Sequence, residues 1–226
     1  MSAYIVLVDE VKNWKKTFPV ILLRQSEVKS MKSLTQLFCL CAMLLFPPNL
    51  LAQVSESQLW QGLQQGKYIA LLRHALAPGT GDPANFKLGD CSTQRNLSAQ
   101  GREQAERIGQ RFKENGLKQA AVYSSQWCRC LETAQHLGLG ERQELPVLNS
   151  FFQDSARGPQ QTAELRDWLQ QQAVVTERPI LLVTHQVNIT GLTGVYPSSG
   201  ELVVIEHPAT LAADSGIMVV GTVATD

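Results

Sequence analysis

The chain has no excess of charge of either sign. Its 226 residues include 20 lysines and arginines and 20 aspartates and glutamates, which give a formal net charge of zero. A balanced chain has no bulk electrostatic attraction for nucleic acid. The sequence also contains no block of like charges, no internal repeat and no low-complexity tract. We therefore expect one α/β domain with a substantial core and no nucleic acid among its partners.

A membrane-spanning run of apolar residues is missing as well. The uncharged stretch 34–46 is shorter than the roughly 20 residues that a transmembrane helix needs. It follows the positive start Met31-Lys32-Ser33, it ends at Pro47-Pro48, and Ala52 offers a small residue for cleavage. This layout is typical of a secretory signal peptide, which we prefer to the alternative of a buried core helix. The sequence predicts a signal peptide at 31–52 and a periplasmic or secreted protein with no stable membrane span after its removal.

Residues 1–30 precede this signal, mix charges of both signs and contain only a short apolar run. An export signal normally begins at its own start. We hypothesise that Met31 is the true initiator and that residues 1–30 come from a start codon assigned too early. The mature domain is then 53–226. N-terminal sequencing of a precursor that begins before Met31 would contradict this hypothesis.

Cysteine is scarce, and none of it forms a zinc motif. Of five cysteines, Cys39 and Cys41 lie inside the predicted signal, while Cys91, Cys128 and Cys130 remain. An oxidising compartment permits a disulfide, and we expect Cys91 to pair with Cys128 or Cys130, leaving the third thiol free. A zinc site is the alternative, which the missing C-x-x-C pair disfavours. The sequence also lacks H-E-x-x-H and any carboxylate cluster. We therefore predict no metal and no cofactor.

What the chain does contain is a set of apolar segments that end in cationic residues. One leads into Arg73 and His74, a second is followed by Arg129, and a third closes at His185. Ligand sites of open α/β sheets lie at the carboxyl ends of strands. A histidine there can attack an electrophile, and an arginine suits a phosphoryl group because its fork donates to two oxygens. The pair Arg73-His74 alone also fits a solvated strand end, but the three segments together favour a functional site.

Strands alternate with helices along the chain, which predicts a mainly parallel sheet. Ser98 is the expected N-cap of a helix that Gly116 ends, with Ala105, Ile108 and Phe112 facing the sheet. The long loop 75–96 is rich in glycine and proline, as functional covers and disordered segments are. The expected strands are 68–73, 121–124, 146–148, 179–184, 202–206 and 217–223, and the expected helices are 53–65, 98–115, 128–137, 162–172 and 189–195.

Four motifs in a fixed order resemble the histidine phosphatase superfamily, which has the phosphoglycerate mutase-like fold. The resemblance spans roughly residues 67–204 and implies a three-layer αβα sandwich with a mainly parallel central sheet. Two positions depart from the family, because Ala75 and Gln186 stand where glycine follows each histidine. These departures leave the substrate open. The motifs are Arg73-His74-Ala75, Leu97 to Ala105, the set Ser125, Arg129, Thr133 and Ala134, and finally His185.

The resemblance implies phosphohistidine chemistry. His74 would be the nucleophile that attacks phosphorus in line, and Arg73, Arg129 and His185 would bind and neutralise the phosphoryl oxygens. His185 would be protonated while it holds phosphate, because a bound anion raises its pKa.

Two further residues are candidates for this site. Asp154 lies about where one branch of the family keeps its general acid, and a solvated turn aspartate is the alternative interpretation. Arg95 precedes the helix at Ser98 and would contact substrate, unless it forms a structural ion pair instead.

These residues predict an exported, metal-independent phosphatase of the histidine acid phosphatase type that hydrolyses a small phosphorylated substrate, a phosphomonoester. One alternative is a noncatalytic phosphate or phosphoglycan binder on the same fold, which the intact His74 disfavours. Another is a phosphohistidine-protein phosphatase, which the export signal disfavours because such substrates are cytosolic. A mutase is disfavoured on the same ground. The sequence specifies neither the substrate nor an oligomeric state.

Overall fold

The computed structural model describes residues 54–174, 178–210 and 216–225. The predicted extension and signal peptide, 1–52, lie outside these described residues, so both stay predictions. No helix in the described ranges is long and apolar enough to cross a bilayer.

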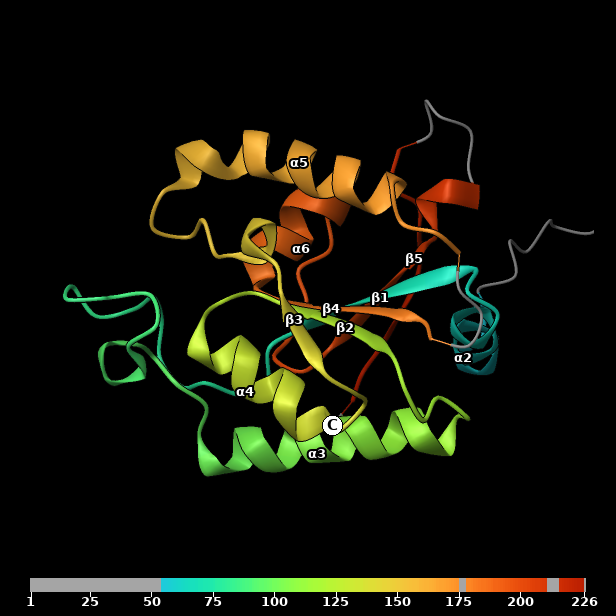
Figure 1. The fold of residues 1–226 in the computed structure, drawn as a ribbon, viewed down its shortest axis with the longest axis horizontal. Helices are drawn as coiled ribbons and strands as arrows, with labels where there is room; N and C mark the ends of the chain where they lie inside the picture. The colour runs from blue at the N-terminus through green and yellow to red at the C-terminus, as the bar shows by residue number, and fades with distance from the viewer. Residues whose placement is uncertain (1–53, 175–177, 211–215, 226) are drawn as a thin grey trace, which may run out of the picture. The chain divides into compact units, whose positions relative to one another are not determined.

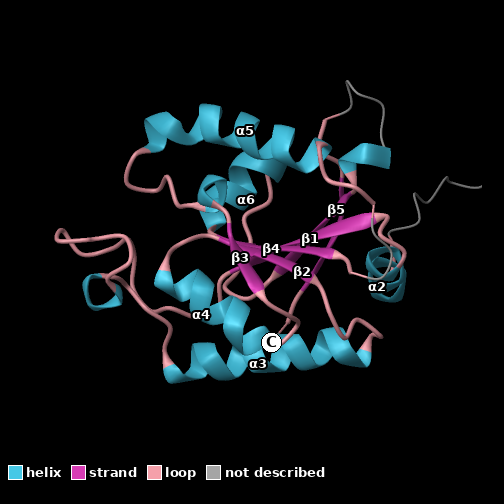
Figure 2. Cartoon of the chain, in the orientation of Figure 1, coloured by secondary structure: helices cyan, strands magenta, loops and turns pink. Residues whose placement is uncertain are grey.

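A six-stranded sheet forms the centre of the described domain, with the strand order β3-β2-β4-β1-β5-β6 (Figure 2). The first four strands in this order are parallel to one another, whereas β5 is antiparallel to β1 and β6 is antiparallel to β5. This mainly parallel sheet confirms the predicted α/β class and the predicted closing hairpin. The strands are β1 (Tyr68–Arg73), β2 (Ala121–Ser124), β3 (Arg142–Glu144), β4 (Ile180–Thr184), β5 (Leu202–Glu206) and β6 (Val219–Val223).

Helices cover both faces of the sheet, so the predicted three-layer sandwich is confirmed (Figure 1). Alternating residues of β1 show the two sides, because Ala70 and Leu72 pack into one apolar cluster while Ile69 and Leu71 pack into the other. The first cluster includes residues of α2 (Glu56–Gln64), α3 (Ala99–Glu114) and α4 (Cys128–Leu137), and the second includes residues of α5 (Gly158–Gln170) and α6 (Gln186–Thr193).

Helix α3 has the predicted signals at both ends. The side chain of Ser98 accepts a hydrogen bond from the Gly101 N–H at 3.0 Å, and Gly116 follows the helix with a φ of 79°. Gly101 is also required by close packing, because a Cβ atom there would overlap the carbonyl oxygen of Leu76. The start of α3 therefore lies directly against the chain that follows His74.

The segment between α4 and α5 differs from the prediction. Residues 146–148 form a short 3-10 helix rather than a strand, and the strand is β3, a few residues earlier. All three residues of β3 are exposed at the edge of the sheet, so no apolar pattern marks them, whereas Leu148 is fully buried. Helix α5 begins before the predicted residue 162, with Pro159 in its first turn, and α6 begins directly after His185.

Candidate active site

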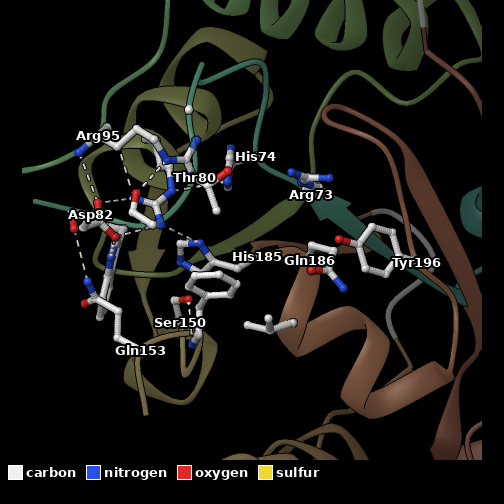
Figure 3. A pocket seen from close by; sticks show the side chains of 16 residues that line it. Arg73, His74, Thr80, Asp82, Arg95, Ser150, Gln153, His185, Gln186 and Tyr196 are labelled. Carbon is white, nitrogen blue, oxygen red and sulfur yellow. Dashed lines mark hydrogen bonds and ion pairs between the residues drawn. The ribbon is translucent and has the colours of Figure 1, made fainter. Parts of the chain in front are cut away.

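The carboxyl ends of three neighbouring parallel strands carry the predicted site residues. Arg73 ends β1 and is followed by His74, His185 follows β4, and Arg129 lies in the first turn of α4 after β2. Because β1 and β2 both pair with β4, these ends meet at one edge of the sheet. All four predicted residues line one cavity of about 140 Å³ (Figure 3). The structure thus brings together residues that the sequence separates.

His74 is held as a neutral imidazole whose Nε2 carries no proton. The ring is buried, Nδ1 donates to the carbonyl oxygen of Ala75 at 2.8 Å, and Nε2 accepts from Nε of Arg129 at 3.2 Å. Since arginine only donates, Nε2 carries no proton, which assigns the tautomer. Burial, and then the positive charge of Arg129, hold the pKa of His74 well below its usual value. A neutral, oriented imidazole is the form that can act as a nucleophile.

Arg129 is bound by a carboxylate that the sequence did not reveal. Its Nη1 lies 2.8 Å from Oδ1 of Asp82 and its Nη2 lies 3.3 Å from Oδ2, so the pair is bidentate. Both side chains are almost fully buried, at 3% and 5% exposed. Asp82 also accepts from the backbone N–H of Arg95 and from the indole of Trp127, each at 3.1 Å. Burial alone would raise the pKa of Asp82, but these donors, led by Arg129, lower it overall.

His185 accepts a hydrogen bond from the same guanidinium of Arg129. Its Nδ1 accepts from Nη2 of Arg129 at 3.3 Å, so its Nε2 carries the proton and donates to Oγ of Ser125 at 2.8 Å. Ser125 in turn donates to Oδ1 of Asn149 at 3.2 Å, so each hydrogen bond in the series from His185 through Ser125 to Asn149 has one direction. Burial and the charge of Arg129 hold the pKa of His185 well below its usual value. The predicted protonation of His185 refers to the phosphate complex and stays a prediction.

The two other arginines of the cavity are anchored by backbone carbonyls. Nη1 of Arg73 donates to the carbonyl oxygen of Pro197 at 2.8 Å, while its buried Nε has no hydrogen-bond partner among the described residues. That donor is available for an anion. Arg95 donates from Nε to Gly81 at 2.9 Å and from Nη1 to Ala77, and it lines the cavity. Its predicted contact with substrate stays a prediction.

Asp154 is not brought into the site. Its side chain is exposed and does not line the cavity, although the preceding Phe152 and Gln153 do. The carboxylate that lines the cavity is Asp82 (Figure 3). The prediction that Asp154 is the general acid therefore gains no support from the cavity lining and stays a prediction.

The two departures from the family motif have different consequences. Ala75 is fully buried and packs against Ala77, Leu97 and Ala105, so its methyl group lies in a small apolar cluster outside the cavity. Gln186, by contrast, lines the cavity and lies beside Tyr196 in Figure 3. Of the two, only Gln186 can contact a bound molecule directly.

A disulfide ties the long loop to the site. Cys91 pairs with Cys128, which is one of the two predicted alternatives, and Cys130 is free as predicted. Cys128 is the first residue of α4 and precedes Arg129. Cys130 is buried with its Sγ 3.5 Å from Nε2 of His185, and burial raises the pKa of this thiol to about 12. Within the described ranges, no group of three or more His, Cys, Asp or Glu side chains is placed to hold a metal ion.

Comparison with known proteins agrees with this arrangement. The family model of the histidine phosphatase superfamily (branch 1) matches residues 69–151, a segment that contains Arg73, His74 and Arg129. No curated protein matches the chain in sequence.

Solved structures with a similar chain path include three hydrolases. Phosphoserine phosphatase from Entamoeba histolytica, solved with 3-phosphoglyceric acid, is 15% identical, covers 70% of this chain and 97% of its own, and has a TM-score of 0.48. A mycobacterial glucosyl-3-phosphoglycerate phosphatase is 17% identical, with coverages of 62% and 89% and a TM-score of 0.45. Mycobacterial hydrolase 2 is 16% identical, with coverages of 68% and 88% and a TM-score of 0.49.

The matched segment supplies the first histidine and two arginines, and β4 brings His185 to the same cavity. The family match over residues 69–151 and the four motifs make the chain similar to the histidine phosphatase superfamily.

Proposed function

We propose that this protein is an exported phosphatase that hydrolyses phosphomonoesters through a phosphohistidine on His74, without a metal ion. The observation that carries the proposal is the state of His74, whose Nε2 lone pair is unprotonated and lies at the cavity beside Arg129. An imidazole held in this way is poised to attack phosphorus. A protein that only binds phosphate has no need of such a nucleophile.

The reaction has two steps that share the same cations. In the first, Nε2 of His74 attacks phosphorus, the P–N bond forms, the P–O ester bond breaks, and the leaving oxygen takes up a proton from solvent water. In the second, water attacks phosphorus, the P–N bond breaks and inorganic phosphate leaves. Both transition states spread negative charge over three phosphoryl oxygens, which Arg73, Arg129 and His185 are placed to neutralise.

The site is less well equipped to protonate the leaving group than to bind the phosphoryl group. Asp82 is the carboxylate of the cavity lining, and its lowered pKa keeps it ionised at neutral pH. It therefore carries no proton to donate. We expect esters with good leaving groups, such as phenols, to react faster than simple alkyl esters.

Export is part of the same proposal. The signal-like layout of 31–52 supports it, and so does the disulfide between Cys91 and Cys128, because disulfides persist in oxidising compartments. A periplasmic or secreted location would give the enzyme access to phosphorylated molecules outside the cytoplasm.

The test is phosphate release from 4-nitrophenyl phosphate in the presence of EDTA. We compare the purified protein with His74→Ala and with the control His136→Ala, because His136 lies outside the cavity and pairs with Glu106. Activity that survives chelation and His136→Ala but disappears in His74→Ala supports the proposal, as does an acid-labile phosphate on the quenched protein. Equal activity in His74→Ala refutes it, and tight phosphate binding with no turnover favours the binding-protein alternative.

A further inference from the structure

Four ionised side chains line the cavity with His74, and we call them the floor: Arg73, Asp82, Arg95 and Arg129. The lining also holds uncharged side chains, which we call the rim: Thr80, Ser150, Phe152, Gln153, Gln186 and Tyr196. A phosphoryl group on the floor therefore places its leaving group against side chains that carry no charge.

Two aromatic rings stand exposed on this rim. Tyr196 is 74% exposed and Phe152 is 52% exposed, and both belong to the small set of large apolar side chains that the described chain leaves in solvent. Aromatic side chains at a pocket mouth offer flat apolar faces that bind rings. Because both rings line one cavity, we expect them to contact the same bound molecule.

The two rings border the opening from different sides. The Phe152 ring lies near Gly81, within 3.8 Å of where a Cβ atom would stand, and the neighbouring Gln153 donates to the backbone carbonyl of Asp82 at 3.2 Å. Figure 3 shows Tyr196 beside Gln186, across the cavity from Asp82 and Arg95. A ring attached to the phosphoryl group would lie between the two faces.

The position of Tyr196 is coupled to the floor. The next residue, Pro197, accepts the hydrogen bond from Nη1 of Arg73 at 2.8 Å. The backbone that carries the ring is therefore fixed by the same arginine that faces the phosphoryl group. This connection sets the distance between the phosphate position and the ring position.

Anionic leaving groups find no comparable partner. The donors of Arg129 are directed at His74, Asp82 and His185. Arg95 is directed at loop carbonyls, and Arg73 donates to Pro197 and keeps a buried Nε without a partner among the described residues. We assign that donor to the phosphoryl group, so a second carboxylate or phosphate on the leaving group would meet the neutral amides, hydroxyls and rings of the rim.

Resting on the proposed phosphatase activity, we propose that the substrates are phosphomonoesters whose leaving group is an uncharged ring, bound between Phe152 and Tyr196. These two residues determine specificity through contact with the ring. The chemical class includes any neutral cyclic alcohol or phenol and excludes esters that carry a second anion, such as a phosphorylated hydroxy acid.

The test compares three alkyl esters, so that leaving-group basicity stays similar: benzyl phosphate, ethyl phosphate and phosphoglycolate. The measured quantity is kcat/KM for each, in the unmodified protein and in Tyr196→Ala, Tyr196→Phe and Phe152→Ala. Met218→Ala is the control, because Met218 is a 51% exposed apolar residue outside the cavity.

We expect benzyl phosphate to exceed ethyl phosphate by about tenfold and phosphoglycolate to show no advantage. The benzyl-to-ethyl ratio should fall about fivefold in Tyr196→Ala and in Phe152→Ala, and should persist in Tyr196→Phe and Met218→Ala. A preference for phosphoglycolate, or a ratio unchanged in both alanine variants, would overturn the ring site while leaving the phosphatase intact. No phosphate release from any of the three esters, in a protein that still hydrolyses 4-nitrophenyl phosphate, would overturn the ring site and leave the phosphatase intact.

Discussion

Asp82 and a bound phosphoryl group would compete for the same arginine. The carboxylate of Asp82 accepts from both terminal nitrogens of Arg129, which are the donors that phosphoryl oxygens need. A second anion on that guanidinium would lie about 5 Å from the carboxylate, where two unit charges repel by roughly 3 kcal/mol at an effective dielectric constant of about 20. Asp82→Asn removes the charge and keeps the shape and one acceptor oxygen.

Movement of the loop that carries Asp82 would relieve part of this repulsion, so we expect a gain smaller than the full Coulomb value. The inhibition constant of inorganic phosphate should fall about tenfold in Asp82→Asn, which corresponds to about 1.4 kcal/mol. The same variant should lose about 3 kcal/mol of unfolding free energy, because it breaks one half of a nearly buried ion pair. Tighter phosphate binding in a less stable protein is an unusual combination.

The assay is competitive inhibition of 4-nitrophenyl phosphate hydrolysis by inorganic phosphate at pH 7, where Asp82 is ionised because its pKa is lowered. The control is Asp154→Asn, which removes the same charge from an exposed side chain outside the cavity. Weaker phosphate inhibition in Asp82→Asn would show that Asp82 mainly positions Arg129. An equal gain in Asp154→Asn would show only an effect of net charge, and either result would refute competition at Arg129.

Three further predictions concern stability and are read from urea unfolding. The pKa values of His74 and His185 are lowered in the folded protein, so the unfolded state takes up protons first as the pH falls through about 6.5. The unfolding free energy should therefore decrease from there toward lower pH, and less steeply in His185→Gln. A flat or opposite profile would contradict this. Gly101→Ala should cost about 3 kcal/mol, because the new methyl group overlaps a backbone carbonyl that cannot rotate away; a loss below about 1 kcal/mol, the usual cost of a tolerated core change, would show that α3 shifts freely. Replacing Cys91 and Cys128 together by alanine should cost about 4 kcal/mol, because the bond closes a loop across a sequence separation of 37 residues, and a reducing agent should lower the stability of the unmodified protein similarly; no change in either sample would indicate that the loop is held by other contacts.

The parts of the site that the sequence predicted are those built on the strands. The apolar segments that precede His74 and His185 form β1, whose four inner residues are buried, and the fully buried β4, and their parallel pairing is enough to bring the two histidines together. Asp82 could not be found in this way. It lies in an irregular loop, and its partner Arg129 is 47 residues away. The path of that loop depends on the disulfide and the ion pair, neither of which has a local pattern. Asp154 was proposed from its position in the sequence, and the structure places it exposed and outside the cavity lining, so its role as general acid stays a prediction.

Arg129 connects the parts of this site through one cation. Its three nitrogens reach His74, which we propose as the nucleophile, the carboxylate of Asp82 and His185. The same positive charge contributes to the lowered pKa of both His74 and His185. A phosphoryl dianion beside Arg129 would more than cancel that charge, so it would raise the pKa of His185. The nucleophile can attack only while it is unprotonated, whereas His185 neutralises the bound group only when protonated. Binding of the anion would thus supply the protonation that His185 needs, while the hydrogen bond from Nε of Arg129 to Nε2 keeps His74 unprotonated and Asp82 holds the guanidinium in place.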